Sequence, residues 1–216
     1  MAPSEARLEA LRDQLARMER GGGGAAFLPL PLAPAIDRHL PGGGLARGAL
    51  HEIQMADRNA GFAFAALILG RTTGPVLWIA PAADTPWAPG LHCLGLPPER
   101  LLLAGYRQPA DGLWLLEEAL RTPGLGGAVL RLDVLDLTAS RRLQLAVEGS
   151  PRIGLLLRAA AEHGPSSATS RWRVASHPDP ALRPCWRLAL LRCRGGQPAA
   201  WLVCHEGGAL QVEALP

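Results

Sequence analysis

The stretch PGGGLARGALHEIQMADRNAGFAFAALILGRTTGPVLWIA, residues 41–80, decides the fold. An apolar run at 48–53 predicts a buried strand, a loop of six or seven residues follows, and residues 60–69 predict an apolar helix. Residues 75–80 predict a second buried strand. This order of strand, loop, helix and strand is the layout in which a glycine-rich loop and a helix N-terminus hold the phosphates of a nucleotide.

The predicted loop lacks the residues that bind phosphate. A working phosphate loop reads G-x-x-x-x-G-K-[ST], with the lysine on the phosphates and the hydroxyl group on magnesium. The 216 residues contain no lysine, so none can fill that role. We therefore expect no catalytic residues, no bound cofactor and no metal. The vestigial loop consists of Met55, Ala56, Asp57, Arg58, Asn59, Ala60 and Gly61.

Composition and charge indicate one sizeable domain with appendages. The chain is 48% hydrophobic, which is enough to bury a substantial core. All 22 basic residues are arginines, and the net charge is +3. The excess arises after residue 170, where six arginines accompany three acidic residues. A weakly basic C-terminal region is compatible with a nucleic acid or an acidic protein as partner.

Cysteine spacing and hydropathy predict a cytoplasmic protein. The four cysteines show no C-x-x-C spacing, and no signal peptide precedes them, so we expect reduced core thiols rather than zinc ligands. The longest apolar run, 60–70, is about half of the ~20 residues that a membrane helix needs, so we expect no membrane association. The cysteines are Cys93, Cys185, Cys193 and Cys204.

Residues 4–19 predict an amphipathic helix, because leucines recur at helical spacing with charges between them. Glycines at 21–24 would end this helix as a flexible linker. We therefore divide the chain into an N-terminal helix with its linker, 1–24, and a main domain, 25–216. The helix either packs back onto the domain or docks with a partner or a second copy of the chain. Its contact candidates are Leu8, Leu11 and Leu15.

The rest of the chain predicts an α/β fold. Helix and strand patterns alternate up to residue 157, and the strands are continuous apolar runs, which is typical of a parallel sheet covered on both faces. Within this region, Leu113, Trp114, Leu116 and Leu120 are the apolar positions expected for a helix at 110–121. After a loop of small residues at 159–170, glycine-rich turns separate short strand-like segments. We expect a mostly parallel sheet flanked by helices, with an antiparallel extension over about 171–216.

Arginines and tryptophans supply the candidate contact residues. In the strand-like triplet Arg171-Trp172-Arg173, the tryptophan faces one side and both arginines face the other. The two arginines could grip phosphates or an acidic partner. Alternatively, they lie on a solvated strand face while Trp172 belongs to the core. The same alternatives of contact or structure apply to Arg141, Arg142 and Trp87.

The pattern from residue 40 to 212 resembles a RecA-type recombinase core and, more narrowly, the ImuA family of RecA-like accessory proteins of inducible mutagenesis. Both the segments themselves and their order and spacing carry the resemblance. They are GGGLARGALHEI (42–53), GPVLWI (74–79), LDLTASRRLQLA (135–146), GLLLR (154–158), SRWRVA (170–175), WRLALLRCRGG (186–196) and WLV (201–203).

The resemblance implies a RecA-like fold and a non-catalytic adaptor of SOS-induced translesion DNA synthesis, within the assembly called the mutasome. The partners it implies are an ImuB-type Y-family-like protein and a C-family DNA polymerase alpha subunit. It also implies a link to RecA itself. Direct binding of single-stranded DNA and formation of a homo-oligomer are left open.

The sequence departs from RecA at each functional element. Only Asp84 offers a carboxylate where RecA activates the attacking water. Asp133 falls near the magnesium-linked carboxylate, and we interpret it as a loop or capping residue. The DNA-binding loop of RecA corresponds to 159–170, which contains no arginine. Two alternative functions remain: a divergent nucleotide hydrolase that uses Arg58 in place of lysine, and a SulA-like inhibitor of cell division with a RecA fold.

Overall fold

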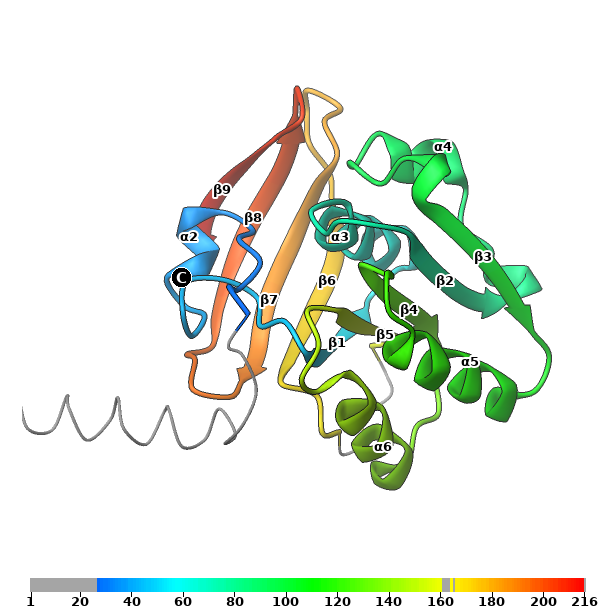
Figure 1. Ribbon diagram of the computed structural model, residues 1–216. Helices are drawn as coiled ribbons and strands as arrows, with labels where there is room; N and C mark the ends of the chain where they lie inside the picture. The colour runs from blue at the N-terminus through cyan, green and yellow to red at the C-terminus, as the bar shows by residue number, and fades with distance from the viewer. Residues whose placement is uncertain (1–26, 161–163, 165, 216) are drawn as a thin grey trace, which may run out of the picture.

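The centre of the protein is a nine-stranded sheet, in the order β3-β2-β4-β5-β1-β6-β7-β8-β9 (Figure 1). A computed structural model describes residues 27–160, 164 and 166–215. The N-terminal helix predicted at 4–19, its glycine linker and part of the loop predicted at 159–170 therefore lie outside the described residues. The strands are β1 (Ala49–Met55), β2 (Val76–Pro81), β3 (Leu101–Tyr106), β4 (Gly127–Arg131), β5 (Ile153–Ala159), β6 (Ser170–His177), β7 (Cys185–Cys193), β8 (Ala199–Glu206) and β9 (Ala209–Leu215). The helices are α2 (Pro34–Asp37), α3 (Arg58–Gly70), η1 (Ala82–Asp84), α4 (Ala88–His92), η2 (Pro98–Arg100), α5 (Pro109–Arg121) and α6 (Leu137–Val147).

The sheet confirms the predicted α/β class. Strand β1 lies between β5 and β6 and is parallel to both, and the pairs β5–β4, β4–β2 and β2–β3 are also parallel. Strands β6 to β9 form an antiparallel meander. The expected antiparallel extension is therefore continuous with the parallel sheet, because β6 pairs with β1 on one side and with β7 on the other.

Alternate side chains of β1 enter two separate cores on opposite faces of the sheet. Leu50 packs into the cluster that contains α5 and α6, whereas Ile53 and Met55 pack into the cluster that contains α3. Every residue of α3 from Ala60 to Leu69 is buried. A helix that is apolar on all sides is buried on all sides, and Figure 1 shows α3 against the middle of the sheet.

The ends of two helices show how local sequence shapes the fold. Helix α3 ends at Gly70, and Arg100 donates hydrogen bonds to the Gly70 and Leu69 carbonyl oxygens that end the helix. Helix α6 begins at Leu137, and Asp136 caps it by accepting a hydrogen bond from the Ala139 amide at 2.6 Å. An aspartate side chain at this position satisfies an amide that has no partner within the helix.

One of the apolar positions predicted on α5, Trp114, is 60% exposed. Its neighbours Leu116 and Leu120 face the sheet, and a residue two positions from Leu116 points to nearly the opposite side of a helix. The expectation of reduced thiols is wrong for Cys185 and Cys204, which form a disulfide. They are directly opposed on β7 and β8, which sequence spacing did not show.

Candidate functional site: a tight strand-to-helix turn and an arginine-bearing sheet

The turn between β1 and α3 is much shorter than the predicted loop. Strand β1 continues through Met55 and α3 begins at Arg58, so only Ala56 and Asp57 lie between them. The remaining residues of the predicted loop already belong to the first turn of the helix. A two-residue turn cannot wrap around a phosphate group, so the predicted loop at 55–61 is corrected to a tight strand-to-helix turn.

The Asp57 carboxylate occupies the N-terminus of α3. Its Oδ1 accepts a hydrogen bond from the Ala60 amide at 2.9 Å and another from the Ser176 hydroxyl at 2.9 Å, and its Oδ2 accepts one from the Ser176 amide at 2.8 Å. Burial raises the pKa of Asp57, but these hydrogen bonds outweigh burial and place its pKa below the usual 3.8. The chain thus supplies its own anion where the helix dipole would attract a phosphate.

The side chain of Met55 fills the space beneath the first turn of α3. Met55 is 5% exposed, and a Cβ atom added at Gly61 would lie 2.1 Å from the Met55 Cγ. Glycine is therefore required at this position so that the helix can approach the strand. The glycine serves packing between helix and strand, and not the approach of a ligand to the backbone.

Arg58, the proposed substitute for the phosphate-loop lysine, binds protein groups instead. Its guanidinium donates to the Ala83 carbonyl oxygen at 3.1 Å and lies 3.4 Å from Asp84 Oδ1. Asp84 also forms an ion pair with Arg131, whose Nε lies 3.2 Å from Oδ2. Both Arg58 and Asp84 are thus committed to an ion network at the ends of β2 and β4.

Asp133 has the structural role that we expected. It pairs with the Arg131 guanidinium at 2.5 and 2.9 Å and accepts a hydrogen bond from the Ala159 amide at 3.0 Å. Burial raises the pKa of Asp133, but the Arg131 and Ala159 hydrogen bonds outweigh burial and lower its pKa overall. The carboxylate joins the ends of β4 and β5. Among residues 27–160, 164 and 166–215, no group of three His, Cys, Asp or Glu side chains could hold a metal ion.

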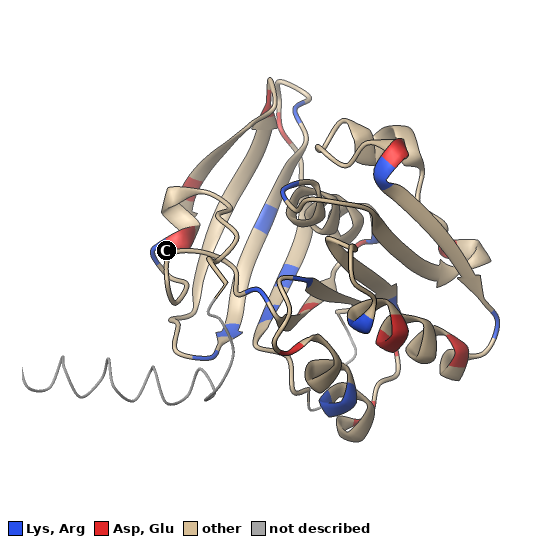
Figure 2. Ribbon diagram, in the orientation of Figure 1, with Lys and Arg blue, Asp and Glu red and all other residues tan. Residues whose placement is uncertain are grey.

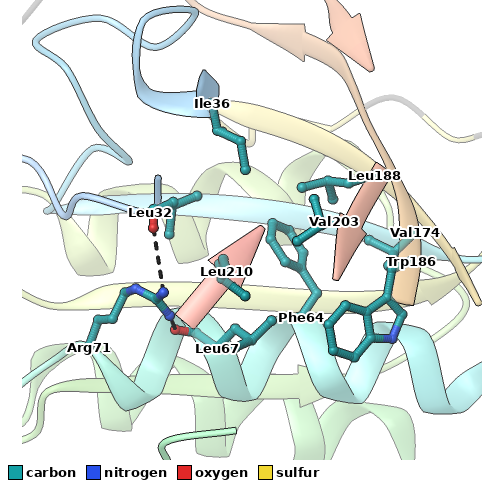
Figure 3. A pocket seen from close by; sticks show the side chains of 10 residues that line it. All are labelled: Leu32, Ile36, Phe64, Leu67, Arg71, Val174, Trp186, Leu188, Val203 and Leu210. Carbon is teal, nitrogen blue, oxygen red and sulfur yellow. Dashed lines mark hydrogen bonds between the residues drawn. The ribbon is translucent and has the colours of Figure 1, made fainter. Parts of the chain in front are cut away.

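Two hollows open elsewhere on the domain, and neither is lined by the β1–α3 turn. The first is an apolar cavity of about 10 Å³ between α3 and the antiparallel strands (Figure 3). Arg71 stands at its side and donates hydrogen bonds to the Leu32 and Leu67 carbonyl oxygens (Figure 3). The second, of about 450 Å³, lies between residues 30–34, Asp37 and Arg71. The first is far smaller than the several hundred Å³ of a typical ligand pocket.

A buried carboxylate holds two arginines together on the opposite face of the sheet. Glu52 is fully buried, and its Oε1 lies 3.3 Å from Arg158 Nη1 and 3.1 Å from Arg171 Nε. The predicted alternation on β6 is confirmed. Trp172 is fully buried in the α3-side core, so the structure favours the core alternative for this residue. Arg171 is committed to Glu52, whereas Arg173 is exposed and contacts Gln54 at 3.4 Å.

Comparison with known proteins decides the family. No protein-family model matches the sequence. The chain is 41% identical to Protein ImuA of Caulobacter vibrioides strain NA1000 / CB15N, over 81% of this chain and 82% of that protein. Protein ImuA of strain ATCC 19089 / CIP 103742 / CB 15 gives the same values. The chain belongs to the ImuA family. The expected membership of the ImuA family is therefore confirmed.

The remaining contact candidates of this ImuA-family chain are scattered rather than gathered at one place. Arg141 and Arg142 are exposed on α6, and Arg142 forms an ion pair with Glu117 of α5. Trp87 is 75% exposed before α4. The leucines at 8, 11 and 15 lie outside the described residues. None of the described helices is both long and apolar enough to cross a membrane.

Sequence reasoning missed two arginines of this ImuA-family chain, Arg187 and Arg192. Both are exposed on β7, beside the predicted Arg171 and Arg173 of β6. Figure 2 shows basic residues along these two neighbouring strands. Period-two alternation in WRLALLRC could have placed Arg187 on the face away from the buried Trp186 and Leu188. The β6–β7 register, which brings the four arginines together, was not readable from the sequence.

Proposed function

We propose that this protein is a non-catalytic, RecA-like adaptor in SOS-induced translesion DNA synthesis and acts in the cytoplasm. The partners in this proposal are an ImuB-type Y-family-like protein and a C-family DNA polymerase alpha subunit. RecA and single-stranded DNA are further candidate partners. Membership of the ImuA family supports the role in inducible mutagenesis, and the strand order supports the RecA-like scaffold.

One observation carries the non-catalytic part of the proposal: the Asp57 carboxylate occupies the N-terminus of α3, with the Met55 side chain packed beneath it. A nucleotide phosphate at this position would meet a like charge and would have to displace three hydrogen bonds. Arg58 makes its contacts with η1 and not with the turn. These contacts argue against the divergent hydrolase that uses Arg58 as its phosphate-binding cation.

Nucleotide assays test this part directly. We expect purified full-length protein to show neither binding of a fluorescent ATP analogue nor release of phosphate with Mg²⁺ and single-stranded DNA present. The control is Arg58→Ala, which should behave like the wild type in both assays. ATP hydrolysis that Arg58→Ala abolishes would establish the hydrolase instead.

Reconstitution tests the adaptor role. We expect the protein to co-purify with the ImuB-type protein and the polymerase alpha subunit of the same bacterium. Deletion of the gene should reduce damage-induced mutation, and a copy that encodes Arg58→Ala should restore it. Co-purification with a tubulin-like cell-division protein in place of these partners would favour the SulA-like alternative and contradict the adaptor role.

A further inference from the structure

Strands β6 to β9 have one face that no described helix covers. Trp172, Trp186 and Trp201 point to the other face, where they pack in the core with α3. The uncovered face carries the residues that alternate with them. Its central rows are Arg173–Ala189–Ala200–Leu215 and Ala175–Arg187–Leu202–Glu213, read from β6 to β9.

Four arginines concentrate on the β6–β7 half of this face (Figure 2). Arg171 is directly opposite Arg192, and Arg173 is one row away from each of Arg192 and Arg187. Among the described residues, no carboxylate lies within ion-pair distance of Arg173, Arg187 or Arg192. Arg171 is held by Glu52, so the charges on this face that lack a carboxylate partner among the described residues are those of Arg173, Arg187 and Arg192.

The acidic residues of this face lie on strands β8 and β9, away from the arginines of β6 and β7. Glu213 is on the edge strand β9, and Glu206 near the end of β8 is already paired with Arg183. The field of the face is therefore positive over β6 and β7. Between the arginines and this acidic edge lie the half-buried side chains of Ala189, Ala200 and Leu202. Arginine is enriched in protein interfaces, and this strip of apolar side chains lies beside the arginines.

We propose that the uncovered β6–β9 face is a docking surface for an acidic polypeptide segment of a partner protein. Side chains on one face of a strand recur about every 6.6 Å, so an extended segment with acidic residues at alternate positions matches the arginine spacing of β6 and β7. The guanidinium groups bind its carboxylates, and its small apolar residues cover the strip. The proposal deepens the adaptor role, on which it rests for the existence of a partner.

Single-stranded nucleic acid fits this face less well. Binding of single strands combines a basic groove with aromatic side chains on which the bases stack. The three tryptophans of these strands are buried on the opposite face. The two central rows of this face, which contain Arg173 and Arg187, include no aromatic residue. A nucleic acid would therefore find phosphate contacts here without a stacking platform.

Fluorescence polarisation tests the proposal with three labelled probes. The first is a short peptide with Glu at alternate positions separated by Ala and Leu, the second carries Lys in place of Glu, and the third is an oligo-dT strand. The test variant of the full chain is Arg173→Glu/Arg187→Glu/Arg192→Glu. The matched control is Arg38→Glu/Arg107→Glu/Arg141→Glu, which changes the net charge equally at other exposed sites.

We expect the acidic peptide to bind the wild type and the control alike, and to bind the test variant at least about tenfold more weakly. The lysine peptide should not bind. Equal binding of the acidic peptide to both triple variants, or no binding to the wild type, would overturn the proposal. If the test variant lost binding of oligo-dT but not of the acidic peptide, the face would be assigned to nucleic acid instead.

Two further measurements keep the test decisive. If circular dichroism shows that the charge-reversed variant does not fold, Arg173→Gln/Arg187→Gln/Arg192→Gln replaces it, with the same expected direction. Co-purification of the ImuB-type protein and the polymerase subunit with the test variant is measured separately. Normal co-purification together with unchanged peptide binding refutes this docking surface while leaving the adaptor role intact.

Discussion

Asp57 and Ser176 are 119 residues apart in the chain, yet the Asp57 carboxylate accepts hydrogen bonds from both the amide and the hydroxyl group of Ser176. The same carboxylate caps α3 through the Ala60 amide. One side chain therefore joins β1, α3 and β6 at the point where a nucleotide-binding protein would hold phosphate. In this protein the N-terminus of α3 is a structural junction.

Removal of this junction should destabilise the protein more than loss of an ordinary helix cap. We expect Asp57→Ala to lower the free energy of unfolding by about 1–3 kcal/mol, because it removes a cap and leaves the Ser176 groups without their partner. Asp136→Ala is the matched control, since Asp136 caps α6 through one exposed hydrogen bond. Urea denaturation measures both. An equal loss in the two variants would show that the link to Ser176 contributes nothing.

The contact between Met55 and Gly61 should appear as energetic coupling. Gly61→Ala forces a methyl group into the Met55 side chain and should cost about 1–3 kcal/mol despite the better helix propensity of alanine. In a Met55→Ala background, the space is free and the same substitution should cost nothing or stabilise. A double-mutant cycle by urea denaturation measures the coupling. Additive effects would mean that Met55 does not restrict this position.

The buried charge of Glu52 should be essential to the sheet. Glu52→Gln leaves Arg158, which is 2% exposed, and Arg171 without their shared carboxylate. Loss of one partner from a buried ion pair costs about 3–5 kcal/mol. The control is Glu118→Gln, which breaks a solvent-exposed pair with Arg121 and should change stability by less than about 1 kcal/mol. Similar losses in chemical denaturation would contradict this assignment.

His51 should make the protein less stable below neutral pH. Its Nε2 lies 2.9 Å from the Ala46 carbonyl oxygen and its Nδ1 lies 2.7 Å from the Ser170 hydroxyl, an arrangement that suits the neutral ring. Burial lowers the pKa of His51 to about 4, against 6.5 in the unfolded chain. The unfolded state therefore binds the proton first as pH falls, and stability declines from about pH 6.5 down to about pH 4.

Denaturation at a series of pH values checks this prediction. The two pKa values correspond to a loss of about 2 kcal/mol between pH 8 and pH 5. His51→Gln should remove most of this loss, whereas His92→Gln, at an exposed helix end, should retain it. The outcome against the prediction is an identical pH profile for wild type and His51→Gln.

The disulfide between Cys185 and Cys204 should stabilise the antiparallel part of the sheet. It closes a loop between residues separated by 19 positions, and a loop of this size corresponds to about 3 kcal/mol. We expect reduction, or Cys204→Ser, to lower the denaturation midpoint, whereas Cys93→Ser should not. Intact mass under non-reducing conditions reports the bond directly. Two free thiols at these positions in the purified protein would support the original expectation.

Several features of the fold were predictable because their causes are local. Continuous apolar runs indicated buried parallel strands, and glycine-rich turns indicated the antiparallel meander. The alternation around Trp172 placed this side chain on the face opposite Arg171 and Arg173, as the structure confirms. The absence of lysine ruled out a working phosphate loop of the usual kind without any knowledge of the fold.

Other features depend on contacts between distant parts of the chain. At the two-residue turn before α3, Asp57 is bonded to Ser176 of a distant strand, and the Met55 side chain packs against Gly61. The exposure of Trp114 follows from which side of α5 meets the sheet. The missed arginines became neighbours only when β6 paired with β7 in a particular register.

The amino-acid sequence by itself determined the α/β alternation, the missing phosphate chemistry and the resemblance to the ImuA family. Each of these follows from short-range periodicity, from composition or from the order of segments along the chain. Only the tertiary structure decided that Asp57 meets Ser176, that Cys185 meets Cys204 and that four arginines share one face. The reason is physical: strand order and register determine which distant residues come within hydrogen-bond distance, and many pairings of the same local pattern satisfy the same periodicity.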